Sequence, residues 1–525
     1  MKRPNILWIT ALILAWFFDF LFWKHNPGIS FAIYVILCLI GGFVLLRVDG
    51  LRPHWKSLLL LLPIAFFAAI SSIRQEPMSL LLSYAFTLFL LGVLAISFLG
   101  GRWLAYSLSD YVANFFKLAG SMAARSLAFI IENRRQQAET GSKGGARRLW
   151  PILRGILIAI PIVAIFAALL ASADLIFAQR LDNLIALFRL EKLPEYIFRA
   201  VYILIGAYLL AGVFLHAATR SQDEKLIGAE KPLVPAFLGF TESAVVLGSV
   251  VLLFAVFVFI QFQYFFGGQA NIHIDGYTYA EYARRGFGEL VAVAFFSLLL
   301  YLGLSAIVKR ETNGQRWGFS GLGIAMVALV GVILFSAFQR LTLYEAAYGF
   351  SRLRAYTHVF MIWLGILLAV VVVLDILRKE RTFALAALLA ALGFAVTLSL
   401  LNVDAFIVRQ NVARAPAGEG LDVPYLASLS ADAVPALAAA FQDQSLPGLT
   451  RDAVGAVLVC RERATASQPD ANWRAFTFSR LWADQALEQV QGQLDAYQVL
   501  DNDWPVRVLT PGSVYYECYL GGTGD

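Results

Sequence analysis

The polar stretch 267–289 holds the side chains with the clearest potential for chemistry. Its candidate ligand-binding residues are Tyr279, Glu281, Arg284 and Arg285. Thr278 and Glu281 have the spacing of a capping box, so we expect a helix to begin there. Glu281 and Arg285 are four residues apart and can pair along one face of that helix. Carboxylates beside arginines suit acid–base chemistry, binding of an anion, or mutual ion pairing.

A second polar stretch, 339–358, supplies five more candidates. They are Glu345, Tyr348, Arg352, Arg354 and His358. The spacing of four between Tyr348 and Arg352 predicts a polar stripe along a helix. A third segment follows the last apolar window on the same predicted side and adds Asp404 and Arg409. We therefore expect three distant segments to bring their charges to one membrane face.

Several roles are open for this charged cluster. The charges can pair with one another and hold the helices and the tail together, or they can form a ligand site or a docking surface. A membrane enzyme acting on a lipid-linked substrate would use Glu281, Glu345 or His358 as acid or base, with arginines holding phosphate. A transporter or flippase would need polar residues continuing to the midplane, and the sequence has few. We interpret the chain first as an envelope sensor or assembly protein that binds an envelope protein or an anionic ligand.

Arginine substitutions separate these interpretations. If the arginines form an anion site, Arg285→Gln and Arg352→Gln are expected to accumulate normally in the membrane and to lose function. If they are packing partners, each substitution leaves a buried carboxylate without its partner and the protein level falls.

The composition identifies the class of protein that holds the cluster. Hydrophobic residues make up 59% of the 525 and charged residues only 15%, whereas soluble domains have about a quarter of their residues charged. The chain is therefore expected to be a polytopic protein of the inner (plasma) membrane, with the lipid bilayer as its partner. The net charge of +6 lies in short loops between apolar windows and gives no indication of nucleic-acid binding.

Apolar windows long enough to cross about 30 Å of hydrocarbon occur about eleven times. They lie at 6–23, 29–46, 57–73, 79–99, 150–171, 195–216, 238–266, 287–308, 319–338, 357–377 and 383–401. The third window is short, so ten spans with one re-entrant segment are also open. The predicted fold is an all-α transmembrane bundle with a small C-terminal α or α+β domain.

Lysine and arginine predict the orientation. With the N-terminus inside, the inner loops carry 22 of these residues and the outer loops 10. The positive-inside rule then predicts a cytoplasmic N-terminus and, with an odd number of spans, an extracytoplasmic C-terminus.

Four regions follow from these patterns. Residues 1–99 form N-terminal spans, and 100–149 form a cytoplasmic basic linker that begins as an interfacial amphipathic helix. Residues 150–401 form the transmembrane core that carries the two polar loops. Residues 402–525 form a tail of mixed polarity, in which 434–441, 452–460 and 479–494 are predicted helices and 497–508 and 514–520 predicted strands.

The three cysteines fall in two settings. Cys38 lies inside the second span and is interpreted as a small apolar filler. Cys460 and Cys518 both lie in the tail, and we expect them to form a disulfide if the tail is extracytoplasmic. This pairing and the loop charges agree on the orientation.

Known catalytic patterns are missing from the sequence. It has no phosphate loop, no His-Glu-x-x-His and no Gly-x-Ser-x-Gly, and its five histidines have no metal-site spacing. No cofactor or metal is expected, and no catalytic residue is identified.

Three segments, 278–287, 343–354 and 421–430, carry a resemblance to a known family. They read Thr-Tyr-Ala-Glu-Tyr-Ala-Arg-Arg-Gly-Phe, Leu-Tyr-Glu-Ala-Ala-Tyr-Gly-Phe-Ser-Arg-Leu-Arg and Leu-Asp-Val-Pro-Tyr-Leu-Ala-Ser-Leu-Ser. The chain resembles a family of bacterial polytopic membrane proteins catalogued only as a domain of unknown function, the four-one-seven-three group, near four-one-five-three. The resemblance runs from about residue 150 to the C-terminus. It implies the architecture and brings no established activity, substrate or site residue.

Overall fold

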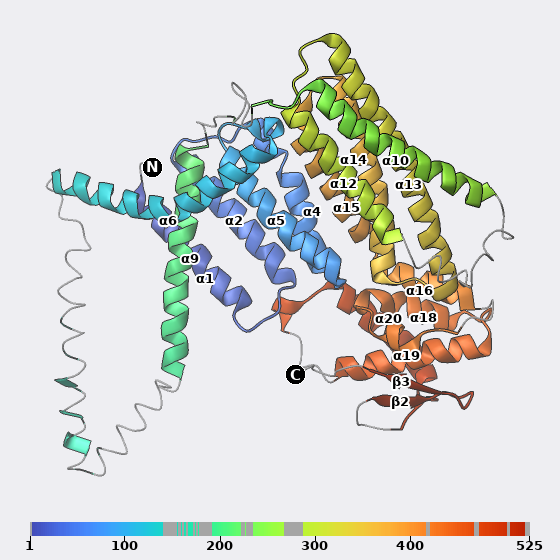
Figure 1. Ribbon diagram of the computed structural model, residues 1–525. Helices are drawn as coiled ribbons and strands as arrows, with labels where there is room; N and C mark the ends of the chain where they lie inside the picture. Colours follow the sequence, from blue (N-terminus) through green and yellow to red (C-terminus); the bar gives the residue numbers. More distant parts are fainter. Residues whose placement is uncertain are drawn as a thin grey trace.

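The long apolar windows fold as α-helices, because a helix satisfies its backbone hydrogen bonds within the segment, as a bilayer requires. The computed structural model describes residues 3–139, 192–221, 235–266, 287–415, 420–466, 472–500 and 505–519, with scattered positions at 155–177 and 226. The helices form two neighbouring groups, and a smaller domain lies at one end of them (Figure 1).

Ten candidate spans occur within the described residues. They are α1 (Pro4–Phe22), α2 (Ile29–Val48), α3 with α4 (Trp55–Leu58 and Leu61–Ile73), α5 (Pro77–Ser97), α9 (Leu193–Thr219), α10 (Phe240–Phe266), α12 (Phe287–Ile307), α13 (Asn313–Tyr348), α14 (Arg352–Ile376) and α15 (Phe383–Leu401). The prediction of a helical polytopic membrane protein is thereby confirmed.

The remaining predicted window, 150–171, lies mostly outside the described residues, so the count of eleven stays a prediction. The described helices on either side are consistent with it. α5 ends beside α3, which follows the end of α2. There Ser57 Oγ donates to the Ser97 carbonyl at 2.6 Å. α9 begins at the other end of α2, where Lys24 Nζ lies 2.9 Å from Glu195 Oε2. α5 therefore ends at the opposite end of the bundle from the start of α9.

The short third window crosses the bundle as α3 and α4, with a break at Leu59 and Leu60. Its beginning contacts the end of α5, where His54 N donates to Phe98 O at 2.8 Å. Its end contacts the tail through Arg74. Because these contacts lie at opposite ends of α5, the window runs the length of the bundle, as expected for a span.

Each group of spans has its own apolar core. Ile64, Phe67 and Leu90 are fully buried in the group of α1, α2, α4, α5 and α9, and Phe319 and Met326 in the group of α10 and α12–α15. Apolar residues of α15 also pack against the core of the first group. This packing joins the two groups side by side (Figure 1).

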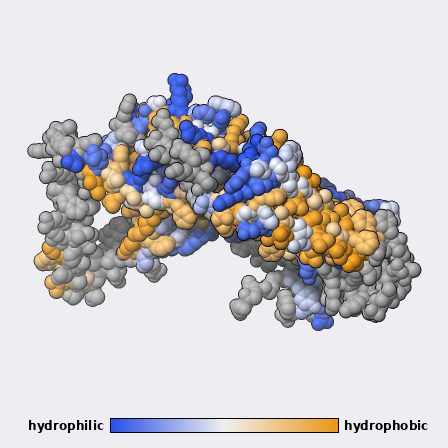
Figure 2. All heavy atoms as spheres, turned by 45° about the horizontal axis from the view of Figure 1, so that its top comes forward, coloured by the Kyte–Doolittle hydropathy of each residue, from blue (hydrophilic) through white to orange (hydrophobic). Residues whose placement is uncertain are grey.

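Large apolar side chains also cover the outside of the spans. Leu62 is 81% exposed, Leu252 67% and Phe259 65%. Figure 2 shows hydrophobic residues along the flanks, and hydrophilic residues gathered on the end of the bundle that is at the top of Figure 1. Such flanks are the expected lipid-facing surface of a membrane protein.

α6 (Leu108–Glu139) lies across the spans at the end opposite the tail (Figure 1). Its exposed apolar side chains recur at helical spacing: Leu108, Val112, Phe116, Leu127 and Ile131. It approaches α9 closely, because a Cβ on Gly212 would lie 2.6 Å from the Met122 Cα. An exposed apolar stripe on a helix that lies across the spans is the geometry predicted for an interfacial helix.

The tail is a small helical domain with a three-stranded sheet. Its elements are α16 (Val403–Arg414), α17 (Val423–Ala427), η6 (Ala431–Ala433), α18 (Val434–Gln442), α19 (Gly448–Ala466), η7 (Trp473–Ala475), α20 (Phe478–Leu494), β1 (Gln498–Val499), β2 (Val506–Leu509) and β3 (Tyr515–Cys518). The strands are antiparallel in the order β1-β2-β3, with Val508 opposite Tyr516. The predicted α+β character is confirmed.

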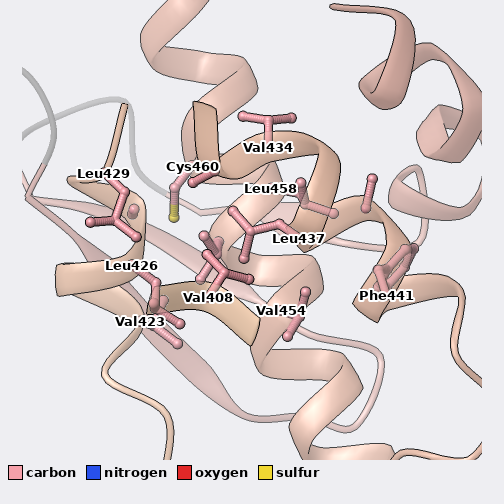
Figure 3. Close-up of a cluster of buried hydrophobic side chains, with 14 of the residues drawn as sticks. Val408, Val423, Leu426, Leu429, Val434, Leu437, Phe441, Val454, Leu458 and Cys460 are labelled. Carbon is pink, nitrogen blue, oxygen red and sulfur yellow. The ribbon is translucent and has the colours of Figure 1, made fainter. Parts of the chain in front are cut away.

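The core of the tail continues into the spans. Val408, Leu437 and Leu458 are fully buried at its centre (Figure 3), and Val359 and Leu398 of α14 and α15 belong to the same cluster. Cys460 and Cys518 are joined by a disulfide whose Cα atoms lie 5.9 Å apart, which ties β3 to α19. The tail is therefore packed against the bundle and not merely tethered to it.

Candidate functional site

A bidentate ion pair joins α14 to α16 where the spans meet the tail. Arg352 is the first residue of α14, and Asp404 is the second of α16. Arg352 Nε donates to Oδ1 of Asp404 at 2.7 Å, and Nη2 donates to Oδ2 at 2.6 Å. Asp404 is fully buried, and the Arg352 side chain is 24% exposed. Two parallel bonds of this kind fix orientation as well as adding energy.

Two tail residues complete the surroundings of this pair. The backbone N–H of Ser430 donates to Asp404 Oδ2 at 2.7 Å. The backbone N–H of Arg352 donates to the Tyr425 hydroxyl at 2.8 Å. Burial raises the pKa of the Tyr425 hydroxyl. The first turn of α14 is thus bound to the tail segment 425–430.

Asp432 makes the corresponding contact with the turn between α4 and α5. Its Oδ2 accepts from the backbone N–H of Gln75 at 2.7 Å and of Glu76 at 2.9 Å, and Arg74 Nη1 lies 3.4 Å from Oδ1. Burial raises the pKa of the Asp432 carboxyl, and these donors oppose that shift. A turn more than 350 residues away in the chain is therefore held by one tail carboxylate.

Glu76 connects this turn back to α14. Its carboxylate caps α5 by accepting from the N–H groups of Met78 at 2.9 Å and Ser79 at 2.7 Å. The Tyr356 hydroxyl, one helical turn after Arg352, donates to the same carboxylate. We name the whole set the junction network: Arg74, Gln75, Glu76, Arg352, Tyr356, Asp404, Tyr425, Ser430 and Asp432.

Glu345 and His358 form a separate contact between α13 and α14. His358 Nδ1 lies 3.3 Å from Glu345 Oε1, and the side chains are 16% and 2% exposed respectively. The His358 ring also packs against Phe338, with ring centres 4.3 Å apart. Two of the three residues named as possible acid or base thus lie beside each other inside the helix packing.

The break between α13 and α14 is held by side chains on both sides. Gly349 has φ of +80°, which favours glycine. Arg354 donates to its carbonyl and stacks over the Tyr344 ring at 4.1 Å. Asn411 of α16 accepts from the Phe350 N–H at 2.8 Å and donates to its carbonyl at 3.0 Å. The loop is therefore fixed to α16.

A cavity of about 680 Å³ lies beside the junction network. Its polar lining includes Arg74, Arg409, Asp432, Asp443 and Ser479. Small apolar side chains form most of the remaining wall, among them Ala405, Val408, Val412, Ala436, Ala439 and Ala440. Most of its walls come from α16, α18 and α20 of the tail, and Arg74 and Asn402 line it at the ends of α4 and α15. We name it the junction cavity.

The predicted candidates separate into four groups. Tyr279, Glu281, Arg284 and Arg285 lie outside the described residues. Arg352 and Asp404 pair at the junction, and Glu345 pairs with His358. Arg354 holds a loop, while Tyr348 is 55% exposed. Arg409 alone of the described candidates lines the junction cavity.

Sequence reasoning missed Arg74, Glu76 and Asp432, which form a third of the nine-residue junction network. One local signal existed for each carboxylate, because Glu76 precedes Pro77 at a helix start and Asp432 follows Ser430 in a turn. Neither signal shows that two segments so distant in the chain meet.

The buried Asp19 of α1 is paired with Arg199 of α9, whose Nε donates to it at 2.9 Å. The exposed Glu242 caps α10 by accepting from Gly239 N at 2.8 Å. Among the described residues, no group of three His, Cys, Asp or Glu residues has the arrangement to hold a metal ion.

Comparison with known proteins identifies a family that covers most of the chain. The family model "Domain of unknown function (DUF4153)" matches residues 61–440. The sequence motifs resembled the four-one-seven-three group and its neighbour four-one-five-three, and the matching model is that of the neighbour. The match begins at residue 61, whereas the resemblance began at about residue 150. No curated protein and no solved structure matches the chain.

Proposed function

This chain belongs to the DUF4153 family of domains of unknown function, and we propose that it is a non-enzymatic binding protein of the bacterial inner membrane. Its ligand is an anionic amphiphile of the envelope, bound in the junction cavity. The proposal places the tail on the extracytoplasmic side, where the loop charges and the disulfide are expected to put it.

The junction cavity is the observation that carries this proposal. Its volume of about 680 Å³ falls within the range of roughly 300–1,000 Å³ typical of small-molecule sites. Such sites are mostly apolar with a few placed polar groups, as this one is. Arg409 is exposed, and no hydrogen bond or ion pair involves its side chain within the described residues. It therefore supplies a cation for the head group of a ligand. The acyl chain of that ligand would contact the alanine wall, formed by Ala436, Ala439 and Ala440 of α18.

The same geometry supports a sensor or assembly role. Arg409 and Val412 lie on α16, and Asp404 of that helix holds Arg352 at the start of α14. An occupant that moves α16 therefore acts on a spanning helix through a bidentate pair. Binding in the junction cavity can therefore change the position of α14 within the membrane.

Photo-crosslinking tests the proposal without requiring that the natural ligand be known. The probe is a long-chain carboxylate that carries a diazirine, added to the full-length protein in detergent. Adducts mapped by mass spectrometry are expected on 403–415 and 434–442.

Ala439→Phe fills the cavity and should lower this labelling about tenfold, corresponding to roughly 1.4 kcal/mol. Ala496→Phe, at an exposed tail position outside the cavity, is the matched control and should leave it unchanged. Labelling confined to lipid-facing surfaces, or unaffected by Ala439→Phe, would refute the proposal.

A membrane enzyme is the second candidate, and Asp432 is the observation in its favour. This carboxyl lines the cavity with Ser479, and its pKa is raised by burial, as is common for catalytic acids. Its bonds to two backbone N–H groups favour the structural role instead. An enzyme would convert the bound amphiphile, so mass spectrometry of the incubated probe separates the two candidates.

A further inference from the structure

A second pocket lies at the end of the spans opposite the tail. It has a volume of about 470 Å³ and is formed by the end of α12, the start of α13 and the end of α14. Four arginines line it, Arg310, Arg316, Arg378 and Arg381, with a single carboxylate, Asp375. We name it the basic pocket. It shares no residue with the junction network or the junction cavity.

Arg310 is fixed in place on the floor of this pocket. Its Nη1 donates to Asp375 Oδ1 at 2.9 Å, and its Nη2 donates to the Ser305 carbonyl at 2.9 Å and hydroxyl at 2.6 Å. The guanidinium stacks over the Phe319 ring at 4.3 Å. Asp375 is 7% exposed and also accepts from the Ser320 hydroxyl. The floor is therefore a rigid, neutralised pair.

The rim of the pocket carries an excess of positive charge. Arg381 is balanced by Asp110 of α6, whose Oδ2 lies 2.9 Å from its Nη2. Arg316 and Arg378 are both exposed, and neither forms an ion pair with a carboxylate among the described residues. Arg316 is oriented by donating from Nε to the Arg310 carbonyl at 3.1 Å. Two guanidinium groups thus remain for an anionic occupant, and their fork geometry matches phosphate oxygens.

The position of the pocket indicates the source of that phosphate. α12 ends at Ile307, α13 begins at Asn313 and α14 ends at Ile376, so the pocket lies at the level of the lipid head groups. Trp317 in its wall is 65% exposed, and the neighbouring Leu377 is 56% exposed. Exposed tryptophan at the end of a span is typical of the membrane interface. Acyl chains of a bound lipid would lie against these side chains.

We propose that the basic pocket binds the phosphate head group of an anionic phospholipid. Basic pockets between spanning helices on the cytoplasmic side suit such lipids, and the loop charges predict that this face is cytoplasmic. The proposal is independent of the function proposed for the junction cavity, because the two sites lie at opposite ends of the bundle.

Native mass spectrometry of the full-length protein tests this proposal. Purified protein is titrated with phosphatidylglycerol, or with phosphatidylcholine, which carries the same phosphate and no net charge. Phosphatidylglycerol is expected to bind more tightly, and Arg316→Gln with Arg378→Gln should weaken it about tenfold. Arg47→Gln with Arg52→Gln removes two exposed charges in the other group of helices (Figure 1) and should have no effect.

Three results would overturn the proposal. They are equal binding of the two lipids to the wild type, unchanged phosphatidylglycerol binding by the Arg316→Gln and Arg378→Gln variant, and complete displacement of the lipid by millimolar inorganic phosphate. The last result would identify free phosphate as the occupant. An unchanged melting temperature of the double variant confirms that it folds, which is expected because both side chains are exposed.

Discussion

At the scale of single residues, four of the described candidates lie in two separate contacts, Arg352 with Asp404 and Glu345 with His358. The sequence identified Arg352, Asp404, Glu345 and His358 as chemically notable, because charges at span ends are costly unless they are paired or functional. It left their role open, since pairing and ligand binding use the same residue types. The structure supports the pairing role for Arg352, because its guanidinium donates to both carboxylate oxygens of Asp404.

Arg352→Gln is expected to destabilise the protein, contrary to the anion-site expectation drawn from the sequence. The substitution leaves the fully buried Asp404 without its guanidinium, at a cost of about 3 kcal/mol. Membrane abundance and melting temperature should fall together. Arg409→Gln, at an exposed position, is the control and should keep both. A variant that melts like the wild type would return Arg352 to the ligand-binding interpretation.

Tyr497 gives a prediction for alkaline pH. Burial raises the pKa of its hydroxyl, with a further contribution from the Asp452 charge. Above about pH 10 the unfolded tyrosine loses its proton while the folded one keeps it. Unfolding then releases a proton, and the free energy of unfolding falls as pH rises. Tyr497→Phe should therefore lose less thermal stability between pH 9 and 11 than the wild type. Parallel pH profiles of the two proteins would contradict this.

At the scale of elements, sequence patterns predicted most of the architecture. The windows 434–441, 452–460 and 479–494 became α18, α19 and α20, because apolar periodicity is a local property that a single segment carries. The full length of α6 and the break between α3 and α4 were not predicted. Both depend on neighbours, since α3 ends where Ser57 contacts α5 and α6 packs closely on α9.

The candidate site was predicted less completely than the elements. Its helices were placed correctly, and Arg409 was named. The contact of Asp432 with the turn at Gln75 was missed, because pairing across more than 350 residues leaves no local pattern. The cavity follows from that contact, since the turn and η6 form one of its walls.

The disulfide between α19 and β3 is expected to raise the melting temperature of the tail. Its two cysteines are separated by 58 residues, and closing a loop of this length stabilises a fold by about 4 kcal/mol at most. Cys460→Ala with Cys518→Ala keeps the buried positions apolar and should lower the melting temperature of the tail. Reduced wild type should melt like the variant. If removing the bridge leaves the melting temperature of the oxidised protein unchanged, the bridge adds no stability.

At the scale of the whole molecule, the fold predicts which loops lie on the same side of the membrane as the tail. The tail contacts the loop after α1 and the turn after α4, because Gly28 lies against Phe476 and Asp432 against Gln75. The loop after α2 lies at the other end of the spans (Figure 1). We therefore expect these two ends of the bundle to face different compartments.

Cysteine labelling in spheroplasts tests the orientation. A membrane-impermeant maleimide should label Ala496→Cys in the tail without permeabilisation, and Arg52→Cys in the loop after α2 only after it. Both positions are exposed, and the wild type, whose Cys38 lies within a span, sets the background. The reverse labelling pattern would place the tail in the cytoplasm.

The central claim is that the junction cavity holds an anionic amphiphile, and cryo-electron microscopy of the protein in native lipid nanodiscs tests it most directly. We expect an elongated density along the alanine wall of α18, with its head within hydrogen-bonding distance of the Arg409 guanidinium, and loss of that density in Ala439→Phe. A cavity that contains only water, or that is closed by movement of α18 toward α16, would contradict the claim.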